Sequence, residues 1–180
     1  MTPMPRYLAF FALLGWLLLS SCDSDGRAAA ALGEVPDTVS EGFRQVTVSS
    51  TGRIEVESDR VETYQDRDIT VFSGARMREF DAEGELRIDG RADLIEVDGD
   101  RNGRAEGGIT VQDFSEDLRL EADQLEWDDG ERRLNGTGPV SIASGDGLAV
   151  AGEGFQADLA RESYVFTDGA EGTLELADDE

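Results

Sequence analysis

An internal repeat constrains this chain more than any other feature of its sequence. Apolar residues that open strand-like segments recur at spacings of 32, 32 and 30 residues, at Ile54, Leu86, Leu118 and Leu148. A second apolar position recurs at similar spacings, at Val61, Leu94, Leu125 and Phe155. A glycine does so as well, at Gly74, Gly108, Gly138 and Gly169. We interpret the pattern as four degenerate copies of a two-strand unit, the glycine marking a turn in each.

The repeated segments have the alternation of β-strands. Apolar and charged residues alternate in segments 53–57, 85–89 and 117–121, and apolar and polar residues alternate in 139–142. Glycine, aspartate and asparagine separate these segments at short intervals, and no segment keeps a helical period for three turns. The sequence therefore predicts an all-β domain of antiparallel strands with one apolar face.

In three copies, the two apolar landmark residues are separated by an odd number of residues. Ile54 and Val61 are seven residues apart, as are Leu118 and Leu125. A flat strand would place such pairs on opposite faces, because successive side chains alternate. Bulges or corners near 58–59, 122–123 and 152–154 would return both residues to one face and bend the strand. We therefore predict a curved sheet that folds over on itself.

The amino terminus has the pattern of a cleaved signal of the lipoprotein type. Arg6 gives a short positive segment, an apolar run follows over residues 7–19, and Ser20 and Ser21 precede Cys22. Cys22 is the only cysteine, which excludes a disulfide framework and suits a lipid attachment site. Cleavage before Cys22 would leave 180 − 21 = 159 residues, enough for one domain. We predict a membrane anchor at Cys22.

The domain boundaries follow from this interpretation. Residues 1–21 are predicted to be the signal peptide, 22–45 a lipidated flexible tether, 46–177 the β-domain and 178–180 an acidic tail. Asp23, directly after the anchor, matches a sorting signal that retains lipoproteins at the inner membrane. The predicted location is therefore the periplasm, with the inner membrane favoured over the outer.

Composition excludes several classes of function. The formal net charge is −24, histidine is absent, and all sixteen basic residues are arginine. Nucleic acid is not an expected partner, because phosphate binding needs a basic surface. No nucleophile motif, phosphate loop or metal-ligand cluster is present. We predict no enzymatic activity, no cofactor and no metal site.

Two short motifs are interpreted as turns. Residues 98–103 imitate the start of a calcium loop, but the twelfth position is Ile109 and not the bidentate glutamate that such loops use. Aspartate, asparagine and glycine are also the common turn formers, so a polar hairpin turn is the favoured interpretation. Asn135 and Gly136 are interpreted as a second hairpin turn.

The inward faces of the predicted strands are mostly aliphatic. The candidate lining residues are Ile54, Val56, Val71, Leu86, Ile88, Ile109, Val111, Leu118, Leu120, Leu125, Trp127, Val140, Ile142, Phe155 and Phe166. Alternating apolar positions usually form an ordinary packed core. Aromatic residues are only 7% of the chain, so a folded sheet lined in this way is also suited to remain an open trough for acyl chains. The sequence leaves both possibilities open.

Two segments carry a resemblance to a known family. Residues 121–128 leading to 138–142, and 154–158 leading to 166–169, resemble the OstA-like repeat. With a membrane-tethered amino terminus and one repeat domain, the chain is similar to the LptC family over about residues 48–176. The resemblance implies a twisted β-jelly roll that receives the acyl chains of lipopolysaccharide or a related lipid. The implied partners are the permeases of an inner-membrane ABC transporter and a periplasmic OstA-like bridge protein.

In the family, terminal strands pair edge to edge with neighbouring jelly rolls, which would involve residues 172–176 here. Two features differ from the family pattern: a lipid in place of the membrane helix that many members keep, and an acidic surface that would repel a phosphorylated headgroup. The alternative function is that of a structural or surface-exposed lipoprotein whose β-domain binds a protein or carbohydrate.

Overall fold

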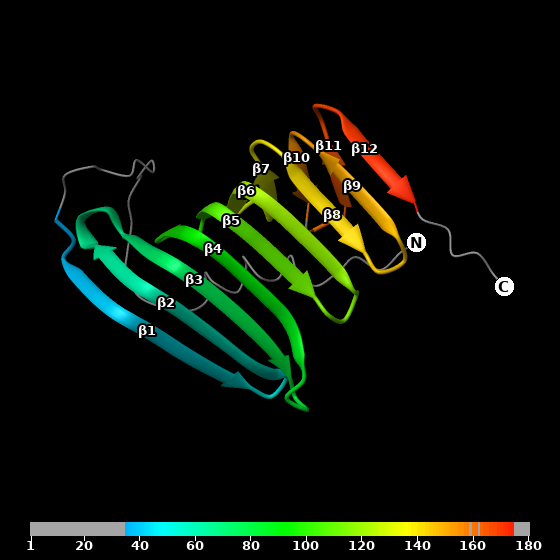
Figure 1. Cartoon of the computed structure of the whole chain (residues 1–180). Helices are drawn as coiled ribbons and strands as arrows, with labels where there is room; N and C mark the ends of the chain where they lie inside the picture. The colour runs from blue at the N-terminus through cyan, green and yellow to red at the C-terminus, as the bar shows by residue number, and fades with distance from the viewer. Residues whose placement is uncertain (1–34, 159, 162, 175–180) are drawn as a thin grey trace.

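The computed structural model describes residues 35–158, 160–161 and 163–174, which form one antiparallel 12-stranded sheet (Figure 1). The predicted signal peptide, Cys22, Asp23, the first part of the tether and the acidic tail 178–180 lie outside the described residues. In the described part of the chain, no helix is long and apolar enough to span a bilayer. The predicted all-β, folded-over sheet is confirmed.

The elements follow one another along the chain with short connections. The first six strands are long, namely β1 (Thr38–Ser49), β2 (Gly52–Tyr64), β3 (Ile69–Asp81), β4 (Leu86–Asp98), β5 (Gly103–Asp113) and β6 (Leu118–Asp128). The last six are short, namely β7 (Arg133–Gly136), β8 (Val140–Ser144), β9 (Leu148–Gly152), β10 (Phe155–Asp158), β11 (Ser163–Phe166) and β12 (Ala170–Leu174). A 3₁₀ turn, η3 (Gln65–Arg67), joins β2 to β3. Strands β1 to β6 therefore form a continuous meander.

The sheet divides into two arms after β6. The second half of β6 pairs with β7, and the sheet continues through β10 to β11. The first half of β6 pairs with β8, and the sheet continues through β9 to β12. We call β7, β10 and β11, together with the halves of β1 to β6 on the same side of the bend, arm A. We call β8, β9 and β12, together with the other halves of β1 to β6, arm B. The long strands belong to both arms, so each must bend once.

The bend runs across the strands as a row of aspartates and glycines that we call the corner. Gly74 in β3 and Gly107 in β5 have positive φ angles of 62° and 74°, which L side chains rarely adopt. A Cβ atom at Gly74 would lie 2.3 Å from Asp59 Oδ2, and one at Gly107 would lie 2.5 Å from Asp93 Oδ2. Glycine is therefore required where a neighbouring strand's aspartate crosses the bend.

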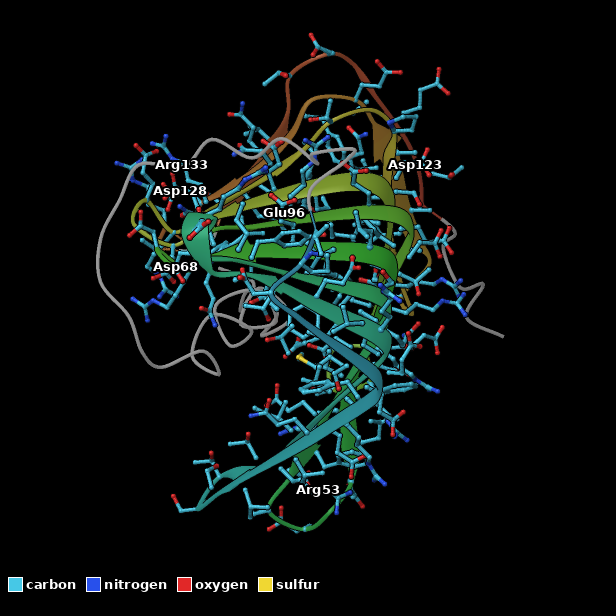
Figure 2. All side chains as sticks on the ribbon, turned by 90° about the vertical axis from the view of Figure 1, so that its left-hand side faces the viewer. Arg53, Asp68, Glu96, Asp123, Asp128 and Arg133 are labelled. Atoms are coloured by element: carbon cyan, nitrogen blue, oxygen red, sulfur yellow. The ribbon has the colours of Figure 1, made fainter. Side chains whose placement is uncertain are left out.

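The bend predicted from this odd separation is confirmed at the corner. Leu125 is buried in the core and Leu118 packs against it although the two are seven residues apart. The β5–β6 register shifts between Glu106 and Ile109, opposite Asp123. Figure 2 shows the strands curving between Arg53 at one end and Asp68 at the other, with Asp123 at the bend. The third predicted bend separates β9 from β10 and carries the chain from arm B to arm A.

Several local predictions were wrong. Strand pairing begins at Thr38, so residues 38–45 belong to β1 and not to the tether, because β2 offers them a complete ladder of hydrogen-bonding partners. Gly74 and Gly108 lie inside strands at the corner and not in turns. Asn135 and Gly136 lie in β7, paired with both β6 and β10, and do not form a hairpin turn.

The 98–103 segment is the hairpin turn that the sequence predicts. The Asp98 carboxylate accepts hydrogen bonds from the backbone N–H and the side-chain amide of Asn102. The Arg101 N–H donates to the Asp98 carbonyl, with Arg101 at a φ of 67°. Within the part of the chain that the structure describes, no group of three or more histidine, cysteine or acidic side chains is placed to hold a metal ion.

Gly136 gives a first test of how closely the arms pack. A Cβ atom at this position would lie 2.6 Å from Val140 Cγ2 and 3.1 Å from Phe155 Cβ. We expect Gly136→Ala to lower the free energy of unfolding by about 2 kcal/mol, because the core must shift to admit the methyl group. Urea denaturation measures the change.

The matched control is Gly103→Ala, where the added Cβ would meet only ordinary contacts, at 3.6 Å from the Glu96 carbonyl oxygen. This variant should stay within about 0.5 kcal/mol of the parent. Equal losses for the two alanines would mean that strand glycines matter for their backbone alone, and not for the contact between β7 and β8.

Candidate functional site

The candidate site is the apolar interior between arm A and arm B. On arm A one cross-strand row of inward residues is Val61, Phe72, Ile95, Ala105, Leu125, Gly136, Phe155 and Phe166. On arm B a facing row is Val56, Met77, Gly90, Val111, Leu120, Ile142 and Val150. Buried residues of both rows belong to one hydrophobic cluster. The bend at the corner thus turns one face of a sheet into a lined interior.

Most of the predicted lining residues lie in this interior. Ten of the fifteen are buried in the cluster, namely Val56, Ile88, Ile109, Val111, Leu120, Leu125, Trp127, Val140, Ile142 and Phe155. Ile54, Leu118 and Phe166 are partly buried and pack against it. The remaining two, Val71 and Leu86, were placed wrongly and lie outside the cluster.

The two errors have local causes. Val71 pairs with Glu62 and Glu96 on the outer face, and its neighbour Phe72 takes the inward position, since adjacent strand residues face opposite ways. Leu86 is half-buried at the start of β4, beside an irregular β3–β4 register at Glu79 and Phe80. Sequence reasoning also missed inward residues that the alternation in β3, β4 and β7 could have supplied, namely Phe72, Met77, Ile95, Val97 and Leu134.

The interior is closed at its centre and reaches the surface at both ends of the sheet. Leu125 is 0% exposed in the middle of the molecule. At the β1–β2 end, Phe43 and Val61 are only partly buried, and the Phe43 ring meets Phe72 edge-on at 6.0 Å. At the other end Phe166 is partly buried and lies 5.4 Å from the Phe155 ring. The apolar lining is therefore continuous from β2 to β11.

A comparison with protein families identifies this architecture. Residues 7–175 match the family described as lipopolysaccharide-assembly, LptC-related. The chain belongs to the LptC family. Members of the LptC family are non-enzymatic transport components of the cell envelope. They face the periplasm and have a role in lipopolysaccharide transport. No curated protein sequence matches the chain.

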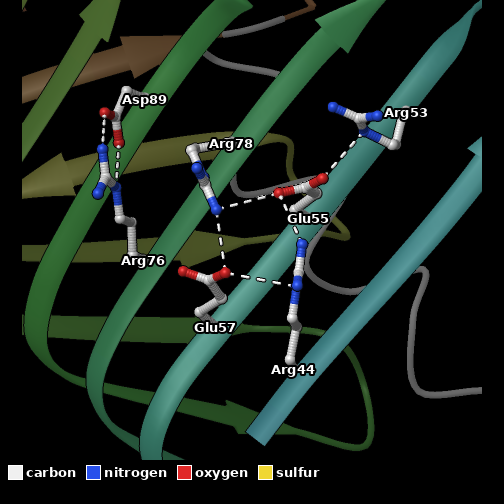
Figure 3. Close-up of polar contacts among 7 residues, drawn as sticks. All are labelled: Arg44, Arg53, Glu55, Glu57, Arg76, Arg78 and Asp89. Carbon is white, nitrogen blue, oxygen red and sulfur yellow. Dashed lines mark hydrogen bonds and ion pairs between the residues drawn. The ribbon is translucent and has the colours of Figure 1, made fainter.

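The outer face of this LptC chain is charged where the inner face is apolar. Figure 3 shows the densest group, in which Glu55 of β2 contacts Arg53 at 3.0 Å, Arg78 of β3 at 3.0 Å and Arg44 of β1 at 3.6 Å. Glu57 contacts Arg44 and Arg78 as well. Glu55 is buried although it is charged, so the arginines replace the water that it loses. The group joins β1 to the rest of the sheet.

We expect Glu55→Gln to lower the free energy of unfolding by about 1 to 3 kcal/mol, because it leaves three guanidinium groups without their shared carboxylate. The value lies below that of a fully buried pair, since Arg44 and Arg53 are partly exposed. Denaturant unfolding measures it. The control is Glu121→Gln, which breaks an exposed pair with Arg119 and should cost at most about 1 kcal/mol. An equal effect of the two changes would contradict the role of Glu55.

A groove of about 410 Å³ at the end of arm A is lined by Glu96, Arg104 and Glu126 together with Trp127 and other residues. Partial burial raises the pKa of the Glu96 carboxyl above its usual value; Arg104 lowers this pKa, whereas Glu106 and Asp98 raise it. A carboxyl whose pKa is higher in the folded state binds more protons when folded. The contribution of this group to stability therefore falls as pH rises from the pKa of Glu96 in the unfolded protein to its pKa in the folded protein.

We expect Glu96→Gln to stabilise the protein slightly at neutral pH, with the gain disappearing below the unfolded pKa of a glutamate, about 4.3. The control is Glu126→Gln, an exposed change in the same groove, which should stay within about 0.5 kcal/mol of the parent at neutral pH. Thermal unfolding of both variants across this pH range measures the difference. A gain for Glu96→Gln that grows on acidification would contradict the sign.

Proposed function

We propose that this protein carries lipopolysaccharide or a related lipid by holding its acyl chains between arm A and arm B. The observation that supports the proposal is the single apolar lining, closed along the corner and partly exposed at both ends of the sheet. It occurs in a chain of the LptC family, whose role is lipopolysaccharide transport. The proposed lining consists of the thirteen predicted residues that lie in or against the core cluster.

The energy of carriage comes from keeping acyl chains out of water. A chain of about fourteen carbons gains on the order of 10 kcal/mol by burial, at roughly 0.8 kcal/mol for each CH₂ group. The interior is packed in its centre, so the arms must separate to admit a chain. Contacts between the arms are then exchanged for contacts with the lipid, and the glycines of the corner allow the bend to open. Loading is therefore an exchange of apolar surfaces and not a net loss of them.

Binding through the headgroup has little support from charge. The chain carries a net charge of −24, so phosphate groups meet an overall repulsive potential. The arginines of the outer network are already paired with Glu55 and Glu57. Recognition in this proposal therefore depends on acyl burial, and the headgroup stays in solvent. The protein acts as a carrier and not as an enzyme.

The free edges of the sheet are the proposed contacts with neighbouring transport proteins. Strand β1 pairs only with β2, and β12 pairs only with β9, so each has a free edge in the described structure. Exposed strand edges accept another strand by β-augmentation. We propose that β1 receives lipid from the permeases of an inner-membrane ABC transporter, and that β12 delivers it to a periplasmic OstA-like bridge protein. Residues 175–176 of the predicted edge lie outside the described residues.

The anchor is proposed from sequence alone. Lipid attached to Cys22 would hold the domain at the membrane, and Asp23 would retain it at the inner membrane. Fractionation tests both points: Cys22→Ala should release the protein from membranes, and Asp23→Ser should shift it toward the outer membrane. Retention of both variants at the inner membrane would contradict the anchor and favour a retained amino-terminal membrane segment.

Photo-crosslinking tests the lipid site. A benzoylphenylalanine side chain at Ile142 would point into the interior of arm B, whereas one at the neighbouring Ser141 would point outward. In membranes that export lipopolysaccharide, we expect lipid adducts at position 142 and not at 141, and we expect them to require ATP. Adducts at neither position would contradict lipid carriage, and equal adducts at both would place the lipid on the surface.

A further inference from the structure

A wide groove lies on the outer face of arm B. Its volume is about 810 Å³, and strands β3 to β6 all contribute to its lining. The charged residues that line it are Arg76, Arg91, Arg119, Asp89 and Asp93. Arginine outnumbers aspartate here, although the chain as a whole has a net charge of −24. The groove is therefore a local site of positive charge on an acidic protein.

Arg91 is the arginine of this groove that has no acidic partner in the described structure. It stands between Gly90 and the buried Ala92 in β4, so alternation directs its side chain to the outer face. Its Nε donates a hydrogen bond to Thr110 Oγ1 of β5 at 2.9 Å. Within the described residues, its two terminal NH₂ groups make no hydrogen bond and its guanidinium makes no ion pair. Thr110 thus holds a guanidinium whose outer edge is unoccupied.

The cross-strand neighbour of Arg91 is a second arginine, Arg76 of β3. Like charges directly opposite each other destabilise a strand pair. Arg76 is compensated by Asp89, to which it donates from Nε at 3.0 Å and from Nη2 at 2.5 Å (Figure 3). Arg91 has no such compensation, so an anion bound at its terminal NH₂ groups would relieve the repulsion between the two arginines.

Further donors lie beside Arg91, one step closer to the rim of arm B. Gln112 of β5 pairs with Arg119 of β6, and both line the groove. Gln112 is half-buried, and its side-chain amide makes no hydrogen bond to any residue that the structure describes. Arg119 is held by Glu121 through Nε and Nη2, which leaves its Nη1 unbonded in the same part of the chain. Phe114, 53% exposed, lines the groove as well.

We propose that this groove binds a phosphate monoester, with its phosphate group on Arg91. A guanidinium fork matches the oxygens of a phosphate or a carboxylate. Phosphate is the better fit, because its three oxygens and its higher charge can engage Gln112 and Arg119 as well. A volume of this size, within the range of about 300 to 1,000 Å³ for organic ligands, leaves room for an organic part that extends toward Phe114.

The site is separate from the proposed lipid-carrying interior, because it lies on the other face of the sheet. The phosphate monoester could belong to a soluble sugar phosphate or to the headgroup of a lipid in the adjoining membrane. Both sources present the same group to Arg91. The experiments below test the phosphate site first and then its source.

The direct test is isothermal titration calorimetry of the full-length protein in phosphatidylcholine nanodiscs, at low ionic strength, where exposed charges are least screened. The probes are glucose 1-phosphate, glucuronate, glucose and inorganic phosphate. We expect glucose 1-phosphate to bind about three- to tenfold more tightly than glucuronate, and glucose not to bind. Equal affinities for the phosphate and the carboxylate would overturn the assignment to phosphate. Absence of binding by both glucose 1-phosphate and inorganic phosphate would overturn the site.

Arg91→Gln should weaken the binding of glucose 1-phosphate at least about tenfold, because it removes the charged donors that the phosphate contacts. The matched control is Arg133→Gln, which removes an exposed arginine on arm A and should change the affinity by less than about twofold. Equal losses in the two variants would show that affinity follows net charge and not the groove, which would overturn the proposal.

Asp89→Asn tests the same site by a gain of affinity, which a damaged fold would not produce. It releases the Arg76 guanidinium to the groove and removes a negative charge from the lining. We expect glucose 1-phosphate to bind about three- to tenfold more tightly. The matched control is Glu131→Gln, which releases Arg133 on arm A and should leave the affinity unchanged. Unchanged or weaker binding in Asp89→Asn would contradict the proposed site.

The lipid composition of the nanodisc distinguishes the two sources. Phosphatidic acid is a phosphate monoester, whereas phosphatidylglycerol is a diester that also gives the disc a negative surface potential. A loss of affinity for glucose 1-phosphate in discs with phosphatidic acid, and not in discs with phosphatidylglycerol, supports a lipid headgroup as the ligand. Equal affinities in the two kinds of disc would exclude the headgroup and support a soluble ligand.

Discussion

Leu125→Ala is expected to lower the free energy of unfolding by about 3 to 5 kcal/mol, the upper part of the range for leucine truncation in a core. Leu125 is fully buried in β6, two residues beyond the corner, and belongs to the cluster that joins the two arms. A cavity there removes contacts that both arms share. Urea denaturation followed by circular dichroism should show one transition at a lower midpoint.

The control is Val48→Ala, on the outer face of β1, where the valine is 74% exposed. This change should stay within about 0.5 kcal/mol of the parent. Two separate transitions for Leu125→Ala, or a loss below about 1 kcal/mol, would show that the arms do not share one core.

Val61→Asp is expected to abolish lipid capture while the domain remains folded. Val61 is partly buried at the β1–β2 end of the interior, opposite Phe72, where we propose that acyl chains enter. A carboxylate beside hydrocarbon costs several kcal/mol unless it is paired. The yield of lipid adduct at a crosslinker on Ile142 should therefore fall at least about tenfold. The loss of stability should be only about 1 to 2 kcal/mol, because the site is partly exposed.

Val46→Asp adds the same charge to the outer face of β1, where the valine is 46% exposed, and should leave the adduct yield unchanged. Capture that persists in Val61→Asp would exclude entry at this end of the sheet. Loss of capture in both variants would point to the added negative charge itself and not to its position.

The repeat and the alternation predicted the fold well because both are local signals. A period of two identifies which face of a strand is apolar, and an odd step between Leu118 and Leu125 shows where the strand must bend. The structure contains that bend, and Asp59, Asp93 and Asp123 lie along it. The family resemblance, which depends on the same repeated segments, is confirmed by the match over residues 7–175.

Errors arose where the decisive partner is distant in sequence. Asn135–Gly136 has the composition of a turn, but pairing with both β6 and β10 holds it in a strand, and the small volume of Gly136 serves the contact with Val140 and Phe155. The start of β1 lacks strong alternation and depends on β2 for its structure. Tertiary pairing overrides local preference in both places.

Most of the buried, inward-facing residues were predicted, but the polar atoms among them were not. Alternation placed most of the lining correctly, and it failed at Val71 because a run of two apolar residues, Val71 and Phe72, gives no indication of which one faces inward. No sequence pattern distinguishes a tryptophan whose N–H is paired from one whose N–H is not. In the described structure, Trp127 Nε1 and Asp113 Oδ2 are buried without a hydrogen-bond partner.

The central claim is that the two arms separate to hold acyl chains. The bend of β6, which belongs to both arms, should open when they separate. Glu116 and Glu131 are exposed in the turns at either end of β6, one on arm B and one on arm A. Spin labels on p-acetylphenylalanine at these two positions give the distance between the rims by pulsed electron resonance. Loading with lipopolysaccharide should lengthen it by roughly 5 Å, half the usual spacing of packed sheets. An unchanged distance in protein that has bound the lipid would contradict the account.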